Sequence, residues 1–178
     1  YGLYFGRVTE EKGVETVIKA YEKLPEYTVK IMGDDTTDEA KRLKKYVENH
    51  KMKNVEFLGF KSGAELENVI KGARFTLIPS IWYDNLPNTA LESFQYSKPV
   101  IASNIGSLPE LVIDGENGYL FKPSNVEDLI KKIKMLDDDT LVKKMGQASR
   151  KRLESRFAPQ THYEDLMKIF NEAVKSRK

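Results

Sequence analysis

The chain has 178 residues, which is enough for one domain with a hydrophobic core and too few for two domains of ordinary size. Its 29 lysines and arginines against 27 aspartates and glutamates leave a formal net charge of +2, which gives no electrostatic reason to expect a nucleic-acid partner. There is no cysteine, which excludes disulfides and thiolate metal sites, and no apolar run reaches the length of a transmembrane segment.

Short β-rich runs alternate with segments of helical periodicity from one end of the chain to the other, which is typical of a parallel sheet covered by helices. The expected strands are Tyr1–Phe5, Thr28–Met32, Asn54–Leu58, Arg74–Ile78, Pro99–Ala102 and Gly118–Phe121. The first of them starts the chain without a Met, so we take the sequence to be a piece of a longer protein.

Apolar residues at helical spacing mark the segments between and after these strands. The first helical face carries Val14, Val17, Ile18, Tyr21 and Leu24, and a later one carries Leu66, Val69 and Ile70. After the sixth strand, Ser124 and Glu127 have the spacing of a capping box and predict the start of a helix. Two more helices are expected, over 140–155 and 159–174, and the last has Tyr163, Leu166, Met167 and Phe170 spaced for packing. The acidic run 137–139 falls between helices, so we interpret it as a helix cap and not as a metal site.

Six β/α units in this order predict one α/β domain over 1–178, Rossmann-like, with a six-stranded parallel sheet and helices on both faces. The common strand order of such sheets places strands one and four side by side. Ligands bind where the chain reverses direction across the sheet, beyond the carboxyl ends of those two strands. The residues that follow Phe5 and Ile78 are therefore the first candidates for a site.

Two cations and two glycines follow the first strand, in the run from Gly6 to Gly13. Arg7 and Lys12 would flank the crevice, while the glycines allow the backbone to turn tightly near a ligand. The three-glycine fingerprint of dinucleotide-binding loops is absent, which disfavours a nicotinamide or flavin cofactor. The competing interpretation is that Arg7 and Lys12 only pair with the neighbouring glutamates, Glu10 and Glu11, on the surface.

The segment after the fourth strand combines a helix start with an acidic side chain. Pro87 suits the first position of a helix, which would leave the N–H groups of Asn88 and Thr89 free to bind phosphate. Glu92 falls one turn later in a largely apolar helix, and its carboxylate could accept hydrogen bonds from two sugar hydroxyls. A solvated helix face is the alternative interpretation of Glu92.

These residues resemble the C-terminal domain of the group 1 family of retaining glycosyltransferases, which have the two-domain GT-B fold. The resemblance runs over nearly the whole chain and depends on five segments in the family's order: Gly6-Arg7 with Lys12-Gly13, Gly33-Asp34, the run from Val55 to Phe60, the loop and helix from Pro79 to Pro99, and the run from Asn104 to Glu110. Family members carry two glutamates with seven residues between them in the fourth segment. The second corresponds to Glu92, and the first is replaced here by Asp84, which is one methylene shorter.

The resemblance implies a role for each of these residues. Arg7, Lys12 and Asp84 would serve catalysis by holding the diphosphate and the transferred sugar, and the other donor-binding residues would be Gly6, Gly33, Phe60, Lys61, Leu86, Pro87, Asn88, Thr89 and Glu92. The implied activity is retaining, metal-independent transfer of a hexosyl group from a UDP- or GDP-linked sugar to a saccharide or lipid-linked acceptor, with no cofactor. The acceptor domain would be N-terminal and lie outside this chain, so the piece alone would be inactive.

Two other functions fit the same residues. A GT-B nucleotide-sugar epimerase or a phosphorylase would share the sheet, and a non-catalytic nucleotide-sugar-binding module would bind the donor without transferring it. The absence of a signal peptide and of a transmembrane segment leads us to expect a cytoplasmic location, with peripheral association at the inner membrane face as a further option.

Overall fold

The computed structural model describes residues 1–176, and their centre is one six-stranded parallel sheet. Its strands are β1 (Gly2–Phe5), β2 (Val29–Met32), β3 (Val55–Gly59), β4 (Phe75–Ile78), β5 (Val100–Ser103) and β6 (Gly118–Phe121). Their order across the sheet is β3-β2-β1-β4-β5-β6, so β1 and β4 are neighbours, as predicted. Each bound agrees with the expected one to within one residue.

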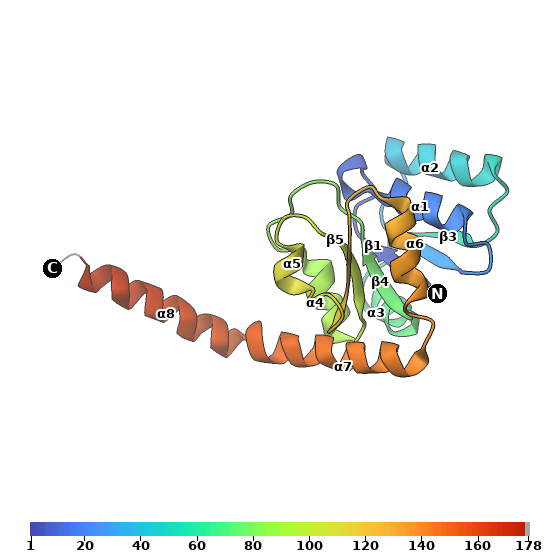
Figure 1. Cartoon of the computed structure of the whole chain (residues 1–178). Coiled ribbons are helices and arrows are strands. Elements are labelled where there is room, and N and C mark those ends of the chain that lie inside the picture. The colour runs from blue at the N-terminus through green and yellow to red at the C-terminus, as the bar shows by residue number, and fades with distance from the viewer. Residues whose placement is uncertain (177–178) are drawn as a thin grey trace.

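Strands β1, β4 and β5 are buried on both faces, which explains why their sequences are nearly continuous apolar runs. Successive residues point to opposite sides of the sheet. Tyr4 therefore joins the hydrophobic core on one side, while Leu3 and Phe5 join a separate core on the other. The two layers of side chains require helices on both faces, and the structure confirms this part of the prediction (Figure 1).

Three helices cover the first face: α1 (Val14–Glu22), α2 (Asp38–Asn49) and α6 (Val126–Lys134). The second face is covered by α3 (Gly63–Gly72), α4 (Asn88–Gln95) and the short α5 (Leu108–Leu111). A 3-10 turn, η1 (Glu10–Lys12), precedes α1, and α7 (Asp139–Arg156) packs against α4 along one end of the sheet (Figure 1).

The start of α6 corrects the capping prediction by one residue. Asn125, and not Ser124, is the N-cap, and its side chain accepts a hydrogen bond from the backbone N–H of Asp128 at 2.9 Å. Ser124 adopts a left-handed conformation with φ of 60° in the turn that precedes the cap. The prediction was wrong because both residues can cap a helix, and only the geometry of the turn decides between them.

The acidic run before α7 has the structural role expected for it. Asp138 is the N-cap of α7 and accepts from the N–H of Thr140 at 2.7 Å. Asp137 accepts from the hydroxyl of Tyr27, and Asp139 pairs with Arg74. Within residues 1–176 the structure contains no cluster of three or more His, Cys, Asp or Glu side chains arranged to hold a metal ion.

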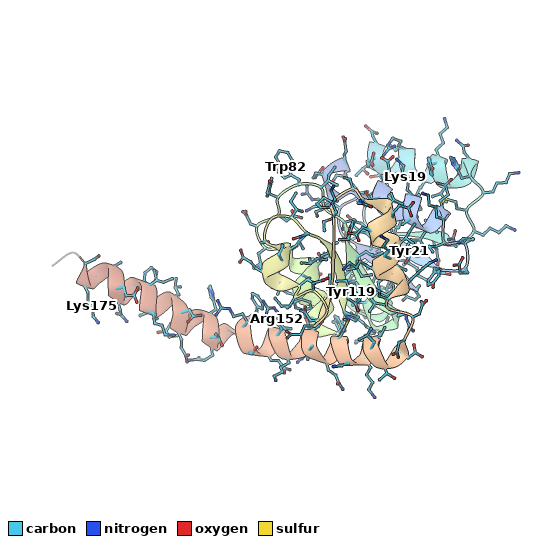
Figure 2. The ribbon with its side chains drawn as sticks, in the orientation of Figure 1. Lys19, Tyr21, Trp82, Tyr119, Arg152 and Lys175 are labelled. Atoms are coloured by element: carbon cyan, nitrogen blue, oxygen red, sulfur yellow. The ribbon has the colours of Figure 1, made fainter. Side chains whose placement is uncertain are left out.

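The last helix, α8 (Pro159–Lys175), departs from the prediction. It extends away from the sheet towards Lys175, as Figures 1 and 2 show, and none of its residues is buried. Its apolar side chains keep the expected spacing, yet Tyr163, Ile169 and Phe170 are each more than half exposed. The expectation that this face packs on the rest of the chain was therefore wrong for the part of the chain described here. No helix among those residues is both long and apolar enough to cross a membrane.

Candidate functional site

The candidate site lies beyond the carboxyl ends of β1 and β4. Gly2, Leu3 and Tyr4 pair with residues of β4 in parallel register, so the loops that follow the two strands leave the same edge of the sheet side by side. A pocket of about 190 Å³ opens between these loops. Its polar lining consists of Gly6, Arg7, Lys12, Ser80, Asp84, Asn88 and Thr89, together with Pro87 and the ends of the strands.

A second pocket of about 320 Å³ adjoins the first and is more apolar. Phe5, Gly6, Arg7 and Thr89 line both pockets, so the two share a wall. The second pocket extends towards the ends of β2 and β3, where its lining includes Met32, Gly33, Asp34, Phe60, Lys61, Leu66 and Glu92. The structure therefore gathers the predicted site residues around one continuous region, with the exception of Leu86, which is 50% exposed and lines neither pocket.

The two cations after β1 differ in their surroundings. The Lys12 ammonium lies 2.6 Å from a carboxylate oxygen of Asp84, and the side chains are only 20% and 22% exposed. Arg7 lies 3.8 Å from Glu11, and its side chain is 72% exposed. Arg7 therefore lies at the surface near a neighbouring glutamate, as the competing interpretation expected, although it also lines the pocket. Lys12 instead turns into the pocket.

The loop after β4 is held in place at several points. The N–H of Ile81 donates to the carbonyl of Glu11 at 2.9 Å, which joins this loop to the one after β1. Gly13 permits the close approach, because a Cβ atom there would lie 2.1 Å from the carbonyl oxygen of Pro79. The hydroxyl of Ser107 donates to the carbonyl of Asp84 at 2.8 Å. The backbone on each side of the pocket is therefore fixed relative to the other.

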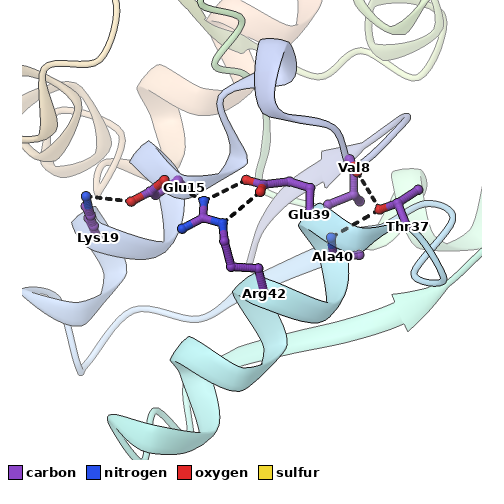
Figure 3. Close-up of polar contacts among 7 residues, drawn as sticks. All are labelled: Val8, Glu15, Lys19, Thr37, Glu39, Ala40 and Arg42. Atoms are coloured by element: carbon purple, nitrogen blue, oxygen red, sulfur yellow. Dashed lines mark hydrogen bonds and ion pairs between the residues drawn. The ribbon is translucent and has the colours of Figure 1, made fainter.

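A polar network behind the site fixes the loop that carries Arg7 (Figure 3). Thr37 caps α2 by accepting from the N–H of Ala40 at 3.1 Å, and its hydroxyl donates to the carbonyl of Val8 at 2.7 Å. Arg42 then bridges α2 to α1 by donating to Glu39 and to Glu15. These bonds connect the residue after Arg7 to two helices of the first face.

Helix α4 begins one residue later than predicted. Pro87 is the N-cap with an extended backbone, and Asn88 is the first helical residue. Within residues 1–176 the backbone N–H groups of Asn88 and Thr89 have no hydrogen-bond partner, and both residues line the first pocket. Free N–H groups at a helix start, together with the helix dipole, favour an anion at this point.

Glu92 projects into the second pocket from the next turn of α4. Burial raises the pKa of its carboxyl group, because desolvation penalises the charged form. Among the described residues, no hydrogen bond or ion pair reaches the carboxylate of Glu92. A half-buried carboxylate without a donor gains from a ligand that supplies hydroxyl groups.

Gly33 at the end of β2 has a packing role that its sequence position did not reveal. A Cβ atom there would lie 1.9 Å from the carbonyl oxygen of Gly6, in a region where the N–H of Gly6 donates to the carbonyl of Met32 at 3.0 Å. Only glycine lets these two loops close against each other. Gly33 therefore positions the wall that both pockets share.

The sequence interpretation did not single out Tyr4 and Ser80, which also line the first pocket. The Tyr4 hydroxyl donates to the carbonyl of Arg7, and the Ser80 hydroxyl donates to the carboxylate of Asp84 at 2.8 Å. Ser80 is buried and lies two residues after the end of β4, and this position in the sequence could have identified it.

Together, the fold and the pockets define a doubly wound α/β protein with a crevice at the switch point of its sheet that is lined by Arg7, Lys12 and the start of α4. Residues 1–152 match the model of the family described as glycosyl transferases group 1, and the chain belongs to this family. This confirms the family resemblance seen in the sequence.

Individual relatives agree with this assignment. An uncharacterized glycosyltransferase of Methanocaldococcus jannaschii is 30% identical over 173 residues, covering 97% of this chain and 48% of that protein. The structure of Anabaena HepE in complex with UDP has the same fold, with a TM-score of 0.86 and 23% identity over 96% of this chain and 48% of that one. The C-terminal domain of a group 1 family glycosyl transferase, LpcC of Francisella tularensis, gives a TM-score of 0.77 and 26% identity, covering 89% and 87% of the two chains. The chain therefore spans about half the length of the M. jannaschii relative and of HepE.

Proposed function

We propose that this chain binds the nucleoside diphosphate part of a nucleotide sugar and serves as the donor-binding domain of a glycosyltransferase. The observation that carries the proposal is the convergence of three features on adjoining pockets: two cations, a helix start with free N–H groups, and a half-buried carboxylate. The first pocket suits the diphosphate and the sugar. The second suits the nucleoside.

In the first pocket, Arg7, Lys12 and the start of α4 at Asn88 and Thr89 supply positive potential from two sides. Negative charge accumulates on the departing diphosphate as the bond between the sugar and phosphate stretches. Groups that neutralise this charge lower the barrier. The charges present in the pocket provide this stabilisation in the proposed mechanism, which is metal-independent and uses no cofactor.

In the second pocket, the carboxylate of Glu92 accepts hydrogen bonds from the ribose hydroxyls, and Phe60 and Lys61 lie at the side where the base would be. Phe60 is 74% exposed, so its ring is free to stack on a base. HepE, which shares this fold, was crystallised with UDP, and that supports a uridine nucleotide as the first donor to test, with GDP-linked sugars as the alternative.

The complete reaction in this proposal is retaining transfer of a hexosyl group to a saccharide or lipid-linked acceptor. Because the chain covers only about half of the M. jannaschii relative and of HepE, we assign the acceptor to a separate N-terminal domain, and the piece alone would bind the donor without transferring sugar. We place the protein in the cytoplasm, or peripherally at the inner membrane face.

A thermal-shift experiment with UDP, GDP and their sugar conjugates tests the binding proposal directly. A ligand that binds only the folded protein stabilises it by mass action, so the correct nucleotide at a hundred times its Kd should add about 2.7 kcal/mol. ADP-linked and CMP-linked sugars serve as comparison ligands. If no nucleotide raises the melting temperature at millimolar concentration, the chain is not a donor-binding domain.

Replacing Glu92 by Gln should weaken binding of a ribonucleotide by about tenfold, because a charge-assisted hydrogen bond to the ribose is lost. The matching 2′-deoxynucleotide should lose less, since it has one hydroxyl fewer to donate. Isothermal titration calorimetry with UDP and 2′-deoxy-UDP measures both losses. Equal losses for the two nucleotides would contradict a ribose role for Glu92.

A further inference from the structure

The Lys12 ammonium of the first pocket already has an anionic partner within the protein. Asp84 lies 72 residues further along the chain, and its Oδ1 atom is 2.6 Å from Lys12 Nζ. About four-fifths of each side chain is withdrawn from solvent, so water screens this pair less than it screens an exposed surface pair. Any phosphate that approaches Lys12 therefore meets a cation whose charge is largely neutralised.

Asp84 is held where it stands, independently of Lys12. Ser80 donates a hydrogen bond to the other carboxylate oxygen at 2.8 Å, and Ser107 binds the Asp84 carbonyl. Gly106 packs against the same residue, because a Cβ atom added to Gly106 would lie 3.2 Å from backbone atoms of Asp84. The carboxylate would consequently stay in the pocket when Lys12 turns to a ligand.

From this geometry we propose that Asp84 is an internal counter-anion that competes with the diphosphate for Lys12, so that the site binds a nucleotide sugar in preference to the free nucleoside diphosphate. This inference rests on the proposed function and adds a specificity-determining role within it. Arg7 has no comparable competitor, because its partner Glu11 is 3.8 Å away and its side chain is largely in solvent.

The preference follows from what each ligand offers to the carboxylate. A free nucleoside diphosphate draws Lys12 away and places its own negative charge beside Asp84, which is left with Ser80 as its donor. A sugar attached to the terminal phosphate would lie next to the same carboxylate, because Asp84 and Lys12 line one pocket. Its hydroxyl groups can donate to Asp84 and replace the lost ammonium. The pair thus weakens binding of the reaction product more than binding of the substrate.

The test compares the Kd values of wild type and Asp84→Asn for UDP and UDP-glucose, and for GDP and GDP-mannose, by isothermal titration calorimetry. Asparagine keeps the shape of the side chain and removes its charge, so the nucleoside diphosphate should bind about tenfold more tightly to the variant. The affinity for the sugar conjugate should rise clearly less, so the preference of the site for the sugar conjugate over the free diphosphate should fall. Trp82, the only tryptophan of the chain, lies two residues from Asp84 and provides a second reading of each Kd by fluorescence.

Three controls separate this effect from a general loss of negative charge or a change in folding. Asp35→Asn removes the carboxylate of another lysine pair, Lys44–Asp35, which is about one-third exposed and lies outside both pockets, and should leave every Kd within about twofold of wild type. In a Lys12→Ala background, Asp84→Asn should keep only the part of its gain that comes from relieving repulsion between the carboxylate and the diphosphate, because no lysine remains to be released. Asp84→Glu retains the charge and should not tighten UDP binding.

The inference is overturned if Asp84→Asn binds UDP and GDP no more tightly than wild type, or if both members of a ligand pair gain equally. It is also overturned if the gain persists in full without Lys12. Wild-type protein that binds none of the four ligands would overturn the proposed function as well, which distinguishes that failure from a failure of the inference alone.

Discussion

Replacing Arg7 or Lys12 by alanine is expected to weaken binding of a nucleoside diphosphate by about ten- to a hundredfold for each residue, because each charge-assisted contact to phosphate contributes about 1.5–3 kcal/mol. The physical basis is the position of both side chains on the first pocket, opposite the free N–H groups of α4. Isothermal titration calorimetry with UDP and GDP measures the loss.

The two variants should differ in a way that the structure explains. Arg7 is largely exposed, so its removal should leave the melting temperature almost unchanged. Lys12→Ala leaves the withdrawn carboxylate of Asp84 without its cation and should also lower the melting temperature. Lys144→Ala provides the matched control, since this exposed lysine of α7 lines neither pocket. Unchanged affinity in both Arg7→Ala and Lys12→Ala would remove these residues from the binding site.

Gly33→Ala is expected to destabilise the fold by about 3 kcal/mol, at the upper end of what a single added methyl group costs in a packed interior. The new Cβ atom would overlap the carbonyl oxygen of Gly6, which is backbone and cannot rotate away. The loop after β1 must then shift, so nucleotide affinity should fall along with stability. Urea unfolding gives the loss of stability, and calorimetry on the folded fraction gives the loss of affinity.

A second glycine separates steric overlap from the cost of backbone conformation. Gly115 has a left-handed φ of 81°, and a Cβ atom there would meet nothing within 4 Å. Gly115→Ala should therefore cost only about 1–2 kcal/mol, from the conformation alone, and leave nucleotide affinity intact. If Gly33→Ala proves as mild as Gly115→Ala, the close approach of Gly33 to Gly6 does not position the site.

The strands and the residues at their ends could be predicted because both are local properties of the chain. Each strand is a short buried apolar run, and the rules of doubly wound sheets then place the ends of β1 and β4 together. These two properties were sufficient to predict that Arg7, Lys12 and Glu92 meet at one edge of the sheet, where the two pockets lie.

The details that escaped prediction depend on contacts between distant residues. Nothing local to Lys12 indicates that it pairs with Asp84, because the pair forms only when two loops 72 residues apart meet at the edge of the sheet. The same applies to Gly33, whose need for glycine is set by Gly6. For α8 the periodicity correctly indicated an amphipathic helix, but periodicity cannot say which surface an apolar face contacts.

The central position of β1 and β4 has a consequence for how the site would fail under stress. Each of these strands is hydrogen-bonded to a neighbour on either side, so neither can detach from an edge of the sheet. Partial opening begins at edges and termini, where few bonds must break together. The diphosphate pocket is thus attached to the segments that open last. The nucleoside pocket, whose lining includes Phe60 and Lys61 after the edge strand β3, would be lost first, so fraying of β3 should weaken the hold on the nucleoside before the hold on the diphosphate.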